Sequence, residues 1–159
     1  MNKHAIIKKI IGRLTDELEI YFRAAQFSRA EATHESSKAE SKYDTRGLEA
    51  SYLARGQSKQ AAELEAAIAE FEKLPAKKFT AAEPIGLGAL VELENNGEHL
   101  FYFIGPRAGG TKILHDQKEI LVITPQSPLG EQLMGKKSGE QPQLNFGGAK
   151  QAAKILSVE

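Results

Sequence analysis

The chain has 159 residues, no cysteine, and 21 basic residues balanced by 21 acidic ones. The absence of cysteine excludes a disulfide framework, a metal site built on thiolates and a cysteine nucleophile. A formal net charge of zero argues against tight, direct binding of nucleic acid. Lys8 and Lys9 interrupt the N-terminal apolar residues, and no apolar run approaches the roughly 20 residues that span a bilayer. We therefore expect a soluble, cytoplasmic protein with no membrane partner.

Composition changes near residue 75. All six prolines lie at position 75 or beyond, and most of the glycines lie in the second half of the chain. This contrast predicts a helical segment over residues 1–75, followed by a domain of strands and turns over residues 76–159.

The pattern of residues 1–75 predicts two long helices. In the first, apolar residues recur at alternating spacings of four and three and form one seam: Ile7, Ile11, Leu14, Leu18, Tyr21 and Ala25, widened by Ile10 and Phe22. The second segment ends at Pro75 and repeats helical spacing with Leu53, Ala61, Leu64, Ile68, Phe71 and Leu74. Two helices that reverse at one short turn form an antiparallel coiled-coil hairpin. A helix of about 30 residues is about 45 Å long, so we expect the tip to project from a small domain.

The expected tip of this hairpin is residues 34–56, where acidic and basic side chains alternate. Glu40 and Asp44 stand four residues apart, so they would share a helix face, and could share a cation, if the first helix extended through them. A charged turn between helices is more often plain solvated surface. Lys42 and Arg46 beside these acids would weaken the recruitment of Mg²⁺ and could instead contact phosphate or an acidic partner.

The second half predicts a small antiparallel sheet with one short helix. Strand patterns at residues 87–94 and 99–104 flank an Asn-Gly turn, which is a strong hairpin signal. Residues 120–123 form a short β-branched run, and weaker strand patterns lie at 143–146 and 154–158. No phosphate-binding loop, paired metal-binding histidines or nucleophile elbow is present in the sequence, so nothing predicts an enzyme.

Residues 127–140, SPLGEQLMGKKSGE, form the most informative motif of the second half. Ser127 is suited to cap a helix, with Pro128 at the first helical position, and Gly135 is suited to end it after about two turns.

The long helical hairpin, followed by a sheet domain with this Ser-Pro, short helix, Gly-Lys and Gly-Glu succession, resembles the bacterial Gre-type transcript cleavage and elongation factors. The resemblance covers nearly the whole chain. It implies an α+β fold in which a coiled-coil hairpin precedes an FKBP-like domain. It also implies that Ser127, Pro128 and Leu129 contact bacterial RNA polymerase while the hairpin enters the secondary channel of the polymerase.

In the family, acidic residues at the tip help to hold a second Mg²⁺ at the polymerase active site, so that the polymerase cleaves backtracked RNA. The polymerase remains the enzyme, the factor binds no cofactor alone, and it meets nucleic acid only in the elongation complex. The usual tip reads Asp-Leu-Ser-Glu-Asn, then a small residue, Glu and Tyr. When Tyr52 is aligned with that Tyr, the two metal-binding positions fall on Thr45 and Leu48.

The displaced acids Glu40 and Asp44 are therefore the candidates for the catalytic and metal-binding role. Two ways of acting on the polymerase remain open, namely stimulation of RNA cleavage and inhibition by occupying the channel. An alternative of another class is a peptide-binding or prolyl isomerase module, since an FKBP-like sheet would supply a groove. Against it, the domain has few aromatic residues, and Phe101, Tyr102 and Phe103 alternate between the faces of one strand.

Overall fold

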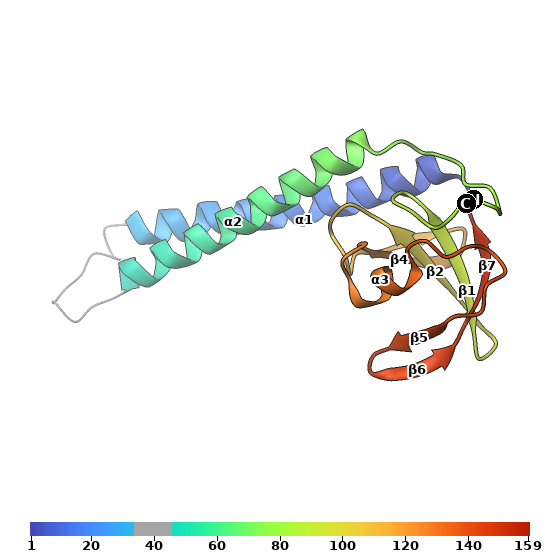
Figure 1. Ribbon diagram of the computed structural model, residues 1–159. Helices are drawn as coiled ribbons and strands as arrows, with labels where there is room; N and C mark the ends of the chain where they lie inside the picture. Colours follow the sequence, from blue (N-terminus) through green and yellow to red (C-terminus); the bar gives the residue numbers. More distant parts are fainter. Residues whose placement is uncertain (34–45) are drawn as a thin grey trace. The chain divides into compact units, whose positions relative to one another are not determined.

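The computed structural model describes residues 1–33 and 46–159, and it shows an α+β protein (Figure 1). Its elements in chain order are α1 (Lys3–Thr33), α2 (Arg46–Lys73), β1 (Leu90–Asn95), β2 (Glu98–Ile104), β3 (Lys112–His115), β4 (Lys118–Ile123), α3 (Pro128–Leu133), β5 (Gln143–Phe146), β6 (Ala149–Ala152) and β7 (Lys154–Val158). The chain forms two compact units, one of Met1–Arg13 with Ala69–Glu159 and one of Leu14–Ile68. None of the described helices is long and apolar enough to cross a membrane.

The unit of Leu14–Ile68 is a pair of helices from α1 and α2. The two helices run antiparallel (Figure 1), and Arg29, near the end of α1, donates a hydrogen bond of 2.7 Å from Nη2 to Oγ of Ser58 in the first half of α2. Leu14 and Ala61 are buried, as the predicted seam requires. Phe22 is 53% exposed, so the prediction that it widens the seam is wrong.

The predicted turn differs from the structure on its C-terminal side. Helix α2 begins at Arg46, so the part of the expected tip (residues 34–56) from Arg46 onwards is helical. The candidate acids Glu40 and Asp44 lie outside the described residues.

The sheet unit contains a five-stranded sheet in the order β3-β4-β2-β1-β7 and a separate two-stranded sheet of β5 and β6. The prediction of a purely antiparallel sheet is wrong, because β2 pairs with β4 in parallel. The Asn-Gly hairpin between β1 and β2 is confirmed. Asn96 and Gly97 both have positive φ, 51° and 83°, as a two-residue hairpin turn of the favoured twist requires.

One face of the five-stranded sheet carries the larger core. Val91, Leu93 and Ile104 point to this face and are fully buried together with Leu133 of α3 and Leu144 of β5. Helix α3 and the β5–β6 hairpin therefore cover this face (Figure 1).

The opposite face of the sheet is covered by the ends of the long helices that belong to this unit. Phe71 of α2 is fully buried, and its ring centroid lies 6.3 Å from that of Phe103 in β2. A Cβ added to Gly105 would lie 2.7 Å from Phe71 Cζ and 2.8 Å from Val122 Cγ1, which shows how closely α2 approaches the sheet. The boundaries between the two compact units therefore lie within α1 and α2, whereas the amino-acid composition changes near residue 75.

Candidate functional site

Helix α3 begins with a local cap that the motif predicts. Ser127 is the N-cap residue: its Oγ accepts a hydrogen bond of 3.1 Å from Gly130 N and donates one of 2.7 Å to Thr124 O. Pro128 occupies the first helical position, where a missing N–H costs nothing. The hydroxyl of Ser127 is thus engaged within the chain, and its role is to position the start of α3.

Gly130 lets the helix start lie against the preceding segment. A Cβ at this position would lie only 1.9 Å from Thr124 O, a distance that no side chain tolerates. The close approach explains why the second residue after Pro128 is a glycine within a helix, where glycine is otherwise unfavourable.

The end of α3 is fixed to the rest of the sheet unit by backbone hydrogen bonds. Gly135 N donates to Ile85 O, and Ile85 N donates in turn to Lys136 O. Gly135 has φ +81°, the left-handed conformation that commonly ends a helix. Leu133 is fully buried in the core beneath the helix.

The residues that follow α3 are held by both side chains and backbone. Glu140 Oε1 accepts a hydrogen bond of 2.9 Å from Lys137 N, and Ser138 Oγ donates one of 3.0 Å to Leu156 O. Gly139 N donates to Ile155 O. The whole motif of residues 127–140 is therefore a defined structure on the sheet.

A side-chain bridge joins α3 to the two-stranded sheet. Gln132 Nε2 donates a hydrogen bond of 2.7 Å to Pro128 O, and Gln132 Oε1 accepts one of 2.8 Å from Asn145 N in β5. The amide of Gln132 therefore fixes α3 against β5, which the sequence pattern did not reveal.

The outward side of α3 presents a small surface made of Pro128, Leu129 and Glu131, here called the α3 surface. Pro128 and Glu131 are exposed and lie three residues apart, so they share one face of the helix. Leu129 is half-buried and packs on the core of the sheet unit. The three predicted contact residues Ser127, Pro128 and Leu129 thus lie together, but only Pro128 is fully presented to a partner.

The described residues offer no metal site. In residues 1–33 and 46–159, no group of three or more His, Asp or Glu side chains could hold a metal ion. The predicted Mg²⁺-binding role of Glu40 and Asp44 falls on residues that lie outside this part of the chain and stays a prediction.

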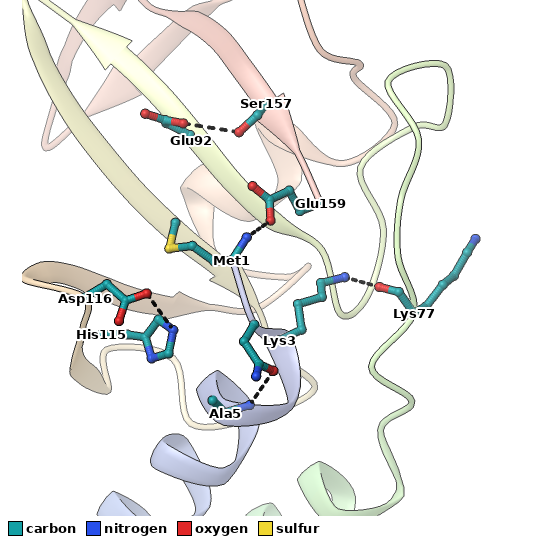
Figure 2. Close-up of polar contacts among 10 residues, drawn as sticks. Met1, Lys3, Ala5, Lys77, Glu92, His115, Asp116, Ser157 and Glu159 are labelled. Carbon is teal, nitrogen blue, oxygen red and sulfur yellow. Dashed lines mark hydrogen bonds and ion pairs between the residues drawn. The ribbon is translucent and has the colours of Figure 1, made fainter.

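A second polar cluster, which sequence reasoning missed, surrounds Lys3 at the start of α1 (Figure 2). Lys3 is 6% exposed, and its Nζ donates a hydrogen bond to Lys77 O. The burial of Lys3 could have been predicted from the sequence, because position 3 continues the apolar face of α1 one turn before Ile6 and Ile7. A lysine at such a position predicts a buried cation.

Comparisons with known proteins give matches to solved structures alone. No family model matches the chain, and no curated protein matches it. The GreA factor homolog 1 (Gfh1) protein of Thermus thermophilus is 25% identical over 94% of each chain, with a TM-score of 0.40. Gfh1 of Thermus aquaticus and a further structure of the transcription factor Gfh1 match at the same identity and TM-score, over 95% of this chain and 94% of theirs. A TM-score this low assigns neither a family nor an activity to this chain.

Proposed function

We propose that this protein binds bacterial RNA polymerase and regulates transcript elongation. The observation that carries the proposal is the motif of residues 127–140, a Ser-capped and Pro-initiated short helix that ends in glycine turns. This motif lies in the strand-containing part of the chain, which follows two long helices, and this order resembles the Gre-type factors. The chain would act on the active site of the polymerase and would not itself be an enzyme.

The α3 surface is the proposed contact with the polymerase. Pro128 is exposed and its ring is rigid, so it can be buried against a partner at little cost in conformational entropy. Ser127 would act indirectly, because its hydroxyl fixes the start of the helix through Gly130 N and Thr124 O. Such a short helix can supply only part of an interface of ordinary size.

The proposed role of the tip is to reach the polymerase active site through the secondary channel. Carboxylate oxygens such as those of Glu40 and Asp44 suit Mg²⁺, and a second metal ion would stabilise the attacking and leaving oxygens during RNA cleavage. Lys42 and Arg46 oppose this role, because their positive charges repel the metal ion. A tip that occupies the channel without promoting cleavage is the alternative mode of regulation.

Backtracked elongation complexes distinguish these two modes. The wild-type chain should either release short 3′ RNA fragments or slow elongation in competition with an authentic cleavage factor. If Glu40→Ala and Asp44→Ala each abolish fragment release while polymerase binding persists, these acids carry the metal role. If release survives both substitutions, that assignment is wrong. If the wild type neither releases fragments nor alters elongation, the proposed regulatory function fails.

A further inference from the structure

A cavity of about 540 Å³ lies within the sheet unit, beside the first turn of α1. Its walls include Lys3 from α1, Ala76 and Phe79 from the segment that follows α2, and Glu159 beyond β7. This volume is in the range of cavities that bind small molecules. The α3 surface does not contribute to it, so the cavity is separate from the proposed polymerase contact.

Lys3 is the unusual group in this wall, since it is a buried cation without a carboxylate partner. Its Nζ donates to the carbonyl oxygen of Lys77 and lies 4.5 Å from the ring centroid of Phe79, and the Nζ of Lys77 lies 4.7 Å from the same centroid. Among the described residues no carboxylate forms an ion pair with Lys3, and buried ammonium groups are normally paired. An anion would therefore be stabilised beside Lys3.

The nearby carboxylates are already engaged. Glu83 Oε1 lies 2.7 Å from Lys77 Nζ, and Glu159 contacts the amino group of Met1 (Figure 2). Burial lowers the pKa of Lys3 to about 8; the charge of Glu159 acts in the opposite direction, and the charge of Lys77 lowers the pKa further. The folded chain therefore holds the Lys3 ammonium at a cost that a bound anion would relieve.

Basic side chains reach the cavity from two of its neighbouring segments. On α1, His4 and Lys3 face the cavity, and Lys78 faces it from the segment after α2. The side-chain carboxylate of Glu159 is paired with the amino group of Met1. Ammonium groups thus outnumber unpaired carboxylates around the cavity, while Ala76 and half-buried Phe79 supply an apolar wall.

We propose that this cavity binds a small organic carboxylate, whose charged group pairs with the ammonium of Lys3 while its apolar body packs against Phe79 and Ala76. An inorganic anion would use the ammonium but would leave the apolar wall without a partner. A neutral molecule would use the wall but would leave Lys3 unpaired. A ligand that carries both a carboxylate and an apolar body is therefore the class that uses both the ammonium group and the apolar part of the wall.

The test uses 4-fluorobenzoate as a probe, titrated into the full chain and followed by ¹⁹F NMR at constant ionic strength. We expect saturable binding near pH 6.5 and markedly weaker binding of the neutral 4-fluorobenzamide. Because only the ammonium form of Lys3 pairs with the carboxylate, affinity should fall by about tenfold between pH 6.5 and pH 9. This pH profile is measured on the wild type and does not depend on how any variant folds.

Variants give the second arm of the test. Lys3→Met keeps the length and apolar stem of the side chain and should abolish binding of 4-fluorobenzoate. Lys118→Met is the matched control, because Lys118 lies over the ring of Phe101 and outside this cavity. Unchanged affinity in Lys3→Met, equal binding of the benzamide, a flat pH profile, or no binding at all would each overturn the proposal.

Discussion

Helix α1 is one continuous element from Lys3 to Thr33, yet its two parts have different surroundings. In its first part, from Lys3 to Arg13, Ile6 and Ile10 are fully buried within the sheet unit. Farther along, Ile20 is 68% exposed and Phe27 is 72% exposed. A helix that is continuous in the backbone can therefore belong to two packing units.

The difference follows from the number of neighbours that each part has. The first part is covered by a sheet face and by the end of α2, so it buries a wide apolar surface. The later part pairs with a single helix, which covers one stripe and leaves the remaining apolar side chains exposed. The stability of α1 should therefore depend far more on its first part and on the residues that pack beside it.

The strongest test of this difference compares two phenylalanines. Phe71→Ala removes a fully buried ring from between α2 and the sheet, and should lower the free energy of unfolding by about 3–5 kcal/mol. Phe22→Ala, at a position that is 53% exposed, should change it by less than about 1 kcal/mol. Urea denaturation measures both. Equal losses would show that Phe22 in the later part of α1 is packed as tightly as Phe71 in the sheet unit.

Lys3, the buried cation in the first part of α1, predicts an unusual dependence of stability on pH. The pKa of Lys3 is about 8 in the folded chain, below its ordinary value of 10.5, so the unfolded chain binds more protons between these pH values. Stability should therefore rise as the pH increases from about 8 to 10.5, by at most about 3 kcal/mol from this group.

The measurement compares unfolding of the wild type and of Lys3→Met at pH 7.5 and pH 10. The variant removes the contribution of Lys3 and keeps those of the other titrating groups. The stability advantage of the variant over the wild type should shrink as the pH rises. An advantage that stays constant or grows with pH would contradict the unfavourable burial of this ammonium.

Substitution of two serines compares the N-cap of α3 with an exposed contact between α1 and α2. Ser127→Ala removes the cap of α3 and should cost about 1 kcal/mol, because Gly130 N loses its acceptor, whereas Thr124 O keeps the backbone N–H of residue 127 as a donor. Ser58→Ala in α2 loses only the exposed contact with Arg29 and gains helix propensity, so its effect should lie within about 0.5 kcal/mol of zero. Thermal unfolding, followed by circular dichroism, measures the stability of both variants. A larger loss of stability for Ser58→Ala than for Ser127→Ala would contradict this prediction.

The smallest expected effect is a gain. A Cβ added to Gly12 of α1 meets no atom within 4 Å apart from the adjacent residues and the nearby backbone of its own helix, and the position is exposed. Gly12→Ala should therefore stabilise the chain by about 0.5–1 kcal/mol through helix propensity alone. A loss of stability in the same denaturation experiment would indicate that α1 needs the flexibility of glycine where the two packing units meet.

The features that the sequence predicted correctly depend on residues that are adjacent or nearly adjacent in the chain. The cap of α3 follows from Ser127 and Pro128, and the hairpin between β1 and β2 follows from Asn96 and Gly97. Strand β3 was missed because it is short and its exposed and buried residues give no clear apolar run. The resemblance suggested the contact residues, but the hydrogen bonds of the Ser127 hydroxyl within the chain became evident only from the structure.

The features that could not be predicted depend on residues far apart in the chain. The parallel pairing of β2 with β4 is set by how the chain crosses the sheet, and no local pattern records it. The close approach of Gly130 to Thr124 O and the bridge from Gln132 to Asn145 are likewise tertiary contacts. Lys3 had a local signal, but its partner Lys77 is 74 positions away.

Binding to purified bacterial RNA polymerase tests the central proposal most directly. Fluorescently labelled chain should bind the polymerase with a dissociation constant in the micromolar range or below, and Pro128→Glu should weaken binding at least tenfold, or about 1.4 kcal/mol. Glutamate is tolerated in the first turn of a helix, so this variant should fold, and Pro84→Glu at another exposed proline should bind like the wild type. Absence of binding by the wild type at micromolar concentration would contradict the proposed function, and undiminished binding of Pro128→Glu would contradict the proposed contact.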